Sequence, residues 1–202
     1  MSNRFTLPDV SPTAASAARS TDASDVALVE RVVGGDRHAF EALYRRYHPR
    51  LHRFLGLMTS RAAVVEEALN DTMLVVWRRA HTYNGQSKVS TWIFAIAWRT
   101  ARKAMRMHDE PVEAPHDDRA SDDPGPEQRL SAGELRTALH GALGDLPAEQ
   151  RCALVLAYFH DQPHAEIARI VDCPVDTVKT RVFHARRRLR ALLHAAAGGA
   201  AG

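Results

Sequence analysis

The sequence predicts an all-α fold consisting of two small helical domains joined by a flexible acidic linker. Apolar residues recur at intervals of three and four through residues 25–107 and again through residues 130–193, which is the pattern of amphipathic helices. No run of alternating apolar and polar residues is long enough to predict a β-strand with partners. Between the helical stretches, residues 108–129 are rich in proline and acidic residues, as is typical of a linker.

Charge is distributed unevenly along the chain. Between Asp109 and Glu127 there are eight acidic residues and one basic residue, Arg119, so the rest of the chain carries 26 basic and 16 acidic residues. A basic body of this kind predicts a polyanionic partner. Two cysteines cannot form a disulfide framework, and neither a signal peptide nor an apolar run of membrane-spanning length is recognisable. The sequence therefore predicts a soluble cytoplasmic protein without membrane insertion.

The two ends of the chain are predicted to be flexible tails. Residues 1–24 are rich in serine, alanine and threonine, and residues 194–202 are almost all alanine and glycine. Neither stretch contains enough apolar surface to offset the entropy lost on ordering.

Three helices are predicted in the first domain. The first follows a Gly-Gly pair, has Asp36 as its N-cap and carries an apolar stripe through residues 40–55. Pro49 lies inside this stripe, so a kink or a restart of the helix is expected there. The second helix covers residues 61–79, and the third lies within residues 89–106. An Asn-Gly pair predicts a turn in the polar loop between them.

The second domain ends in the pattern of a helix-turn-helix motif. A short helix within residues 163–171 is followed by a tight turn and by a longer helix that Asp176 is expected to cap. The longer helix has one apolar face, and its six basic residues between Lys179 and Arg190 have no acid among them. In this motif the second helix enters the major groove, where its first turns contact bases and nearby cations contact phosphates. The pattern therefore predicts DNA binding.

Both domains resemble one protein family. The segment "LPAEQRCALVLAYFHDQPHAEIARIVDCPVDTVKTRVFHARRRLRALL" is similar to region 4 of bacterial sigma-70 family RNA polymerase sigma factors of the extracytoplasmic-function (ECF) class. The segments "DRHAFEALYRRYHPRLHRFL", "VVEEALNDTMLVVWRRA" and "STWIFAIAWRTARKAMR" are similar, in order and spacing, to region 2 of that class. The resemblance implies a region 2 helical bundle in residues 25–107 and a region 4 helix-turn-helix domain in residues 130–193.

The resemblance also implies a function and partners. The chain would bind core RNA polymerase, direct it to specific promoters and promote promoter melting, in a stress or envelope response. The implied partners are the coiled coil of the largest polymerase subunit, the polymerase flap region, promoter DNA and an anti-sigma factor. The free chain would be a monomer.

Three sets of site residues follow from the resemblance. The core-polymerase set, whose carboxylates and amide suit an arginine-rich partner, is Glu66, Glu67, Asn70 and Asp71. The minus-ten set, which would hold an extruded base and the phosphates of one strand, is Tyr83, Asn84, Ser87, Lys88, Ser90, Trp92, Arg99 and Arg102. The minus-thirty-five set is Thr177, Lys179, Thr180, Arg181, Phe183, Arg186 and Arg187. Within it, Lys179, Thr180 and Phe183 are expected to contact bases, and the others are expected to contact phosphates.

The sequence departs from the family pattern at three positions. Asn70 replaces the commoner glutamine, Asp176 stands where glycine is frequent, and Asp172 stands where the family usually has the glycine of the turn. Aspartate tolerates the left-handed conformation better than most residues, so the turn is expected to form with some strain.

Other interpretations remain open. The acidic face of the second helix is also the pattern of an ordinary solvated face. The alternative function is a conventional helix-turn-helix transcriptional regulator with a helical sensor domain, although such regulators usually bind as dimers. No glycine-rich phosphate loop, nucleophile–base pair or ligand cluster is recognisable, so no enzyme activity, catalytic residue, cofactor or metal is expected.

Two pairs of residues are of the types found in chemical sites. His160 and His164 flank Pro163 and lack a third ligand nearby, which argues against a metal site. Cys152 and Cys173 are interpreted as packed thiols, and a redox role for Cys173 stays open as an alternative.

Overall fold

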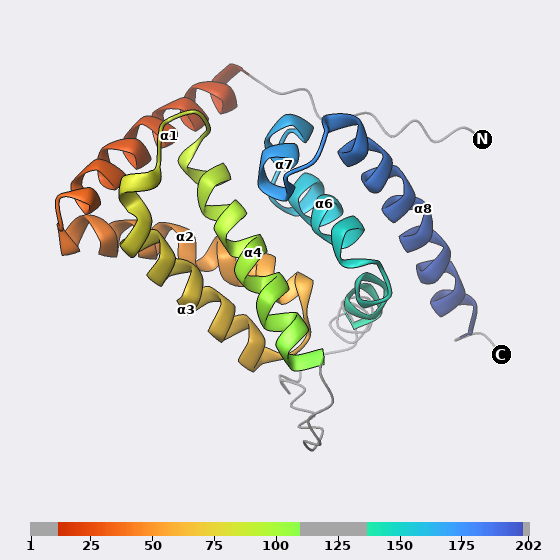
Figure 1. The fold of residues 1–202 in the computed structure, drawn as a ribbon. Helices are drawn as coiled ribbons and strands as arrows, with labels where there is room; N and C mark the ends of the chain where they lie inside the picture. The colour runs from red at the N-terminus through yellow and green to blue at the C-terminus, as the bar shows by residue number, and fades with distance from the viewer. Residues whose placement is uncertain (1–11, 110–136, 200–202) are drawn as a thin grey trace, which may run out of the picture.

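The computed structural model describes residues 12–109 and 137–199, and among these the side chains of residues 22–107 and 137–193. The first part contains four α-helices and a short 3-10 helix, which are α1 (Pro12–Val33), α2 (Arg37–Met58), α3 (Ala62–Arg79), η1 (Ala80–Thr82) and α4 (Val89–Asp109). The second part contains a helical segment over residues 137–144 and then α6 (Ala148–Phe159), α7 (His164–Val171) and α8 (Val175–Gly199) (Figure 1). No β-strand occurs in the two described ranges, and the all-α prediction is confirmed.

Helix α1 occupies much of the stretch that was expected to be a disordered tail. It begins at Pro12 rather than after residue 24, and the end of this stretch is tied to the first domain. The carboxylate of Asp22 accepts a hydrogen bond from the backbone N–H of Val89 at 3.2 Å. The structure therefore differs from the predicted tail over residues 12–24, which are helical, and residues 1–11 lie outside the described part of the chain.

A buried carboxylate joins α1 to α2. Asp25 is 2% exposed, forms an ion pair with Arg46 and accepts a hydrogen bond from the Tyr47 hydroxyl at 2.5 Å. Burial, together with the neighbouring Asp25 carboxylate, raises the pKa of Tyr47. A charge buried in this way is stable only when it is paired, so the three side chains fix the position of α1 on α2.

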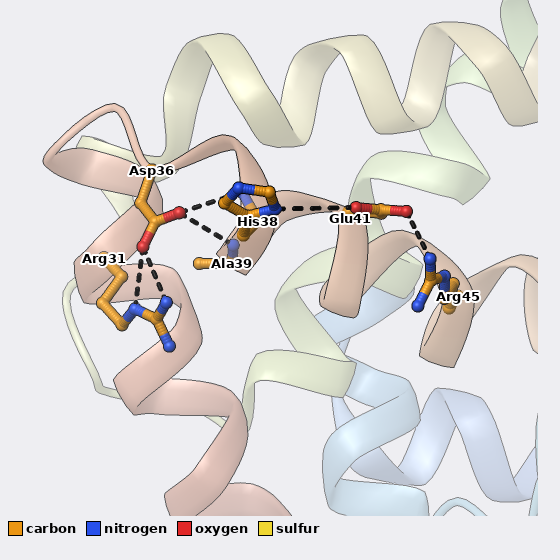
Figure 2. A network of polar contacts seen from close by, with 6 residues as sticks. All are labelled: Arg31, Asp36, His38, Ala39, Glu41 and Arg45. Atoms are coloured by element: carbon orange, nitrogen blue, oxygen red, sulfur yellow. Dashed lines mark hydrogen bonds and ion pairs between the residues drawn. The ribbon is translucent and has the colours of Figure 1, made fainter.

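The N-terminus of α2 is capped as predicted (Figure 2). The Asp36 carboxylate accepts hydrogen bonds from the backbone N–H groups of His38 at 2.9 Å and Ala39 at 3.1 Å. The same carboxylate accepts from the Arg31 guanidinium at 2.7 and 3.0 Å. The hydrogen bond from Arg31, followed by that from the Ala39 amide, lowers the pKa of Asp36. Asp36 therefore both begins α2 and anchors the end of α1.

The expected stripe of α2 is mostly buried, but Pro49 does not restart the helix. Helix α2 continues from Arg37 to Met58 with Pro49 inside it, because the side chains before and after the proline are held in the same core. Tyr47, Leu51 and Phe54 are all fully buried. Tertiary packing can maintain a helix through a proline that lacks one backbone hydrogen bond.

The two helical domains pack directly against each other. Buried side chains of both belong to one continuous hydrophobic core, with α4 against α7 and α2 against α6 (Figure 1). The domain boundaries also shift, because α4 continues to Asp109 and α8 continues to Gly199, within the expected C-terminal tail. Most of the expected linker lies outside the described residues, which resume at 137.

Candidate nucleic-acid and protein interfaces

Helices α7 and α8 form the predicted helix-turn-helix motif. Asp172 ends α7 in the left-handed conformation, with φ 52° and ψ 61°, as expected for the aspartate that replaces the family's glycine. The N–H of Cys173 then donates to the carbonyl of Ala168 at 3.1 Å, which closes the turn before Pro174 and α8. The left-handed turn at Asp172 therefore sets the angle between α7 and α8.

The first turn of α8 differs from the expectation in two ways. The helix begins at Val175, so Asp176 lies inside the first turn rather than at the N-cap, because Pro174 supplies the carbonyl that receives the N–H of Val178 at 3.2 Å. The Asp176 carboxylate instead forms an ion pair with Lys179 Nζ at 2.9 Å. Lys179, the first of the six cations of this helix, is therefore paired with an acid that precedes the run in the sequence.

The rest of α8 has one buried face and one exposed face. Val178 and Ala185 are fully buried, whereas the Phe183 ring is 54% exposed and packs edge-on against the His184 ring. Of the minus-thirty-five set, the exposed members are Lys179, Thr180, Phe183, Arg186 and Arg187. Thr177 and Arg181 are only partly exposed, and Arg181 Nη1 lies 3.6 Å from Cys173 Sγ.

The loop before α4 is an ordered turn closed by two aromatic rings. The Tyr83 hydroxyl donates to the carbonyl of Ser87 at 2.6 Å, and the Tyr83 and Trp92 ring centroids lie 5.6 Å apart. Asn84 accepts from the N–H of Gln86 at 3.1 Å, and Gly85 has a positive φ of 71°, which a turn of this kind requires. The loop therefore presents a half-buried aromatic pair beside exposed polar groups.

The members of the minus-ten set differ in exposure. Asn84, Lys88 and Arg99 are exposed, whereas Ser87 and Ser90 are partly exposed. Arg102 lies 5.4 Å over the Trp98 ring, and its guanidinium is 3.6 Å from the Glu149 carboxylate of α6. The loop and the exposed side of α4 lie near one another, but Arg102 is engaged by the second domain.

The core-polymerase set forms one exposed face of α3. Glu66, Glu67, Asn70 and Asp71 are all exposed, and Glu66 lies 3.5 Å from His52 Nε2 on α2. These residues lie on the opposite side of α3 from its buried residues, which include Ala68, Leu69, Thr72 and Met73.

An apolar groove beside this face was missed in the sequence analysis. It lies between α2 and α3 and is lined by Phe40, Tyr44, Leu74 and Trp77, with Asn70 at its edge. Leu74 is 43% exposed, and the Phe40 and Trp77 ring centroids are 5.1 Å apart. A leucine on the outer side of an otherwise acidic face was the available signal, because an exposed apolar side chain next to polar groups is typical of protein contact sites.

Cysteine chemistry and metal binding have little support in the described part of the chain. Cys152 is fully buried, and this burial raises the pKa of its thiol, which disfavours the reactive thiolate. Cys173 is only partly buried. Within residues 22–107 and 137–193, no three histidine, cysteine or carboxylate side chains are grouped as metal ligands.

None of the described helices is both long and apolar enough to cross a membrane.

Comparison with known proteins covers both domains. Residues 43–110 match the family model described as Sigma-70 region 2, and residues 136–189 match the one described as Sigma-70, region 4. The RNA polymerase sigma-H factor of Pseudomonas aeruginosa is 31% identical over 183 residues, which cover 84% of this chain and 93% of that protein. The ECF RNA polymerase sigma factor SigM of Mycobacterium tuberculosis is 34% identical over 172 residues, which cover 84% of this chain and 85% of that protein.

A solved structure has a similar fold. The structure of CnrH in complex with the cytosolic domain of CnrY aligns with a TM-score of 0.66 and 23% sequence identity. The alignment covers 85% of this chain and 98% of CnrH.

Proposed function

Since the chain belongs to the ECF class of the sigma-70 family of RNA polymerase sigma factors and directs RNA polymerase to promoters, we propose that it does so through three separate surfaces. The exposed face of α3 binds the coiled coil of the largest polymerase subunit. The loop before α4, with α4 itself, binds the minus-ten element as it melts. Helix α8 binds the minus-thirty-five element, and the flap region of the polymerase contacts the same domain. A sigma factor is not an enzyme, so these surfaces act by binding alone.

The arrangement of α8 carries this proposal. Its apolar face is buried in its own domain, while Lys179, Thr180 and Phe183 project from the first turns behind the Asp172 turn. That is the geometry by which a recognition helix reads base edges in the major groove. Arg186 and Arg187 lie further along the exposed face, where cations can contact phosphates.

The loop before α4 suits a single strand rather than a duplex. Tyr83 and Trp92 supply aromatic surface for stacking, and Lys88 and Arg99 supply exposed charge for phosphates. Stacking of bases on aromatic rings and a cationic path for the backbone are the two requirements of single-strand binding. Promoter melting exposes such a strand, so this loop would favour the open DNA.

We further propose that the chain acts in the cytoplasm as a monomer and is held inactive by an anti-sigma factor in a stress or envelope response. The solved complex of CnrH with the cytosolic domain of CnrY supports a protein partner of a similarly folded chain. The exposed α3 face and the adjoining groove of Phe40 and Leu74 would be available to either partner.

Run-off transcription with purified core polymerase tests the residue-level proposal. The wild-type chain should confer promoter-dependent initiation on the core, and a variant with alanine at Tyr83 and Trp92 should bind the core but initiate poorly. Pre-melting the minus-ten region of the template should restore part of its activity. A conventional regulator, the alternative function, would bind DNA without core polymerase and would not support initiation by the core alone.

A further inference from the structure

The start of α4 is not capped by the residues that precede it in the sequence. Lys88 stands in the N-cap position, because its carbonyl accepts the first helical hydrogen bond, from the N–H of Trp92 at 3.1 Å. A lysine side chain has no acceptor for the free N–H groups of the first turn. The Ser87 hydroxyl donates to the carbonyl of Lys88 at 3.4 Å. Neither side chain therefore gives the first turn the oxygen that an N-cap usually provides.

An aspartate of α1 supplies this oxygen. The Asp22 carboxylate accepts a hydrogen bond from the N–H of Val89, the first residue of α4, at 3.2 Å. Val89 is fully buried, so water cannot replace this acceptor, and a buried N–H without a partner would destabilise the start of the helix. The carboxylate also lies at the positive end of the helix dipole. Asp22 therefore caps α4 from a different helix, 67 residues away in the chain.

The position of Asp22 is fixed by the packing of α1. Asp25, three residues later and so on the same side of the helix, is buried with Arg46 and Tyr47 of α2. Helix α1 also packs on η1 and on α4 (Figure 1). Burial first, and then the charges of Asp22 and Asp25, raise the pKa of Tyr83. The two carboxylates of α1 therefore lie close to the beginning of the loop between η1 and α4.

This loop, residues 83–88, which we call the minus-ten loop, is held at both ends. At its beginning, the Tyr83 hydroxyl donates to the carbonyl of Ser87 at 2.6 Å. At its end, the chain enters α4 at Val89, whose N–H is held by α1. Trp92 follows Val89 by one helical turn, and its ring centroid lies 5.6 Å from that of Tyr83. A displacement of Val89 would therefore move the Trp92 ring relative to the Tyr83 ring.

We propose that Asp22 is a positioning residue for the minus-ten loop: by capping α4 from α1, it holds the Tyr83 and Trp92 rings in the arrangement that binds an extruded base. This role rests on the proposed function, in which the loop binds the melted strand. Asp22 acts through the N–H of Val89 and does not itself contact DNA. A preformed pair of rings binds more tightly, because the loop does not have to be ordered when the strand arrives. Loss of the cap should therefore weaken recognition of the base and leave phosphate contacts largely intact.

Three single substitutions in the full-length chain test the cap. Asp22→Ala removes the acceptor, whereas Asp22→Asn keeps a side-chain oxygen that can accept from Val89. Glu30→Ala is the matched control, because it removes an exposed carboxylate from the same helix. Each chain is assembled with core polymerase, and fluorescence anisotropy measures the Kd for two labelled single strands. One strand carries the minus-ten element of a promoter that the wild-type holoenzyme uses, and the other has that element scrambled.

We expect Asp22→Ala to raise the Kd for the element strand about three- to tenfold, the factor typical of a lost helix cap. The Kd for the scrambled strand should rise less than about twofold, because phosphate contacts dominate there. Asp22→Asn and Glu30→Ala should stay within about twofold of wild type on both strands. The measurement uses assembled holoenzyme, so a loss of fold stability alone would not change the ratio between the two strands.

Three results would overturn the role of Asp22. Equal weakening on both strands by Asp22→Ala would show an effect that is not specific to the base. Tighter binding would show that the carboxylate obstructs a phosphate at the N-terminus of α4. Unchanged binding would show that the loop keeps its arrangement without the cap.

A variant with alanine at both Tyr83 and Trp92 separates this role from the proposed function. If that variant distinguishes the two strands as well as wild type does, the minus-ten loop does not bind the base, and both proposals fail. If it loses the distinction while Asp22→Ala keeps it, the loop binds the base and only the role of Asp22 fails.

Discussion

Asp71 is the residue on which the proposed polymerase-binding surface of α3 can be tested most directly. Its side chain is exposed, so Asp71→Arg should leave the core of the domain intact while placing a cation against an arginine-rich partner. We expect co-purification with core polymerase to be lost, with an unchanged melting temperature. Glu30→Arg, an equal charge reversal at an exposed position of α1, should still co-purify. If Asp71→Arg co-purifies as wild type does, the face of α3 is not the docking surface.

Lys179 is proposed to contact a base, and in the free chain its side chain forms a local ion pair. In the free chain its ammonium lies 2.9 Å from Asp176, an exposed pair of small net stability. If Lys179 contacts a base, Lys179→Ala should reduce the discrimination between bases at one base pair of the upstream element by about 1–3 kcal/mol of binding free energy. Discrimination at the other base pairs should change little. Competition between promoter fragments for the holoenzyme would measure this. Arg186→Ala should instead weaken all fragments alike, and the same uniform loss for Lys179→Ala would assign the lysine to a phosphate.

At the scale of the element, the start of α2 depends on one side chain with two tasks. Asp36→Ala removes the N-cap and the partner of Arg31, and should lower the free energy of unfolding by about 1 kcal/mol. Asp36→Asn should retain most of this stability, because asparagine caps equally well. Because the pKa of Asp36 is lowered in the folded chain, its ionised carboxylate stabilises the fold at pH values above its ordinary pKa of 3.8. This stabilisation is lost as the pH falls through the pKa of the folded state. Urea unfolding at pH 7 and pH 3 would check the effect of each substitution and the pH dependence. A large loss of unfolding free energy in Asp36→Asn would show that the ion pair with Arg31, rather than the N-cap, contributes most of the stability.

The elements with strong local signals were predictable from the sequence, and those fixed by distant contacts were not. Asp36 marks the start of α2 and Asp172 the end of α7, because capping and left-handed turns depend on neighbouring residues. Helix α1 was missed because its composition is weak for a core helix. Its position depends instead on Asp22 and Asp25, whose partners are 67 and 21–22 residues away in the chain.

At the scale of the whole molecule, the sequence predicted two domains but not their contact. Thr91 and Glu166 are ordinary polar residues of two helices, and nothing local indicates that their side chains meet 2.6 Å apart. The same holds for Arg102, which was assigned to DNA from its position and is engaged by Glu149 in the free chain. The exposed helix faces were therefore predictable from residue type and spacing, whereas the contacts that engage a residue such as Arg102 depend on the arrangement of the domains.

The interface between the domains also contains a histidine that should make the closed arrangement, in which α7 packs on α4 and α6 packs on α2, sensitive to acid. His160 packs against Phe54 of α2 and Phe94 of α4, with ring centroids 5.9 and 5.0 Å away, and its Nε2 is buried without a hydrogen-bond partner. Burial first, and then the charges of Arg50 and Arg53, lower its pKa to about 4. The closed chain therefore holds this imidazole neutral.

The direction of the pH effect follows from the difference between the lowered pKa of His160 in the closed arrangement and its ordinary pKa. When the domains separate, His160 loses the contacts that bury it, so its pKa should rise towards the ordinary value of 6.5 and the ring should take up a proton that the closed form excludes. The closed arrangement should lose stability as the pH falls from about 6.5 towards about 4, and this group should have no effect above that window. Small-angle scattering at pH 7.5 and pH 5 should show a larger radius of gyration at pH 5. His160→Phe should abolish most of this increase, whereas His81→Gln, at an exposed position of η1, should retain it. An equal increase in His160→Phe would assign the opening to other groups.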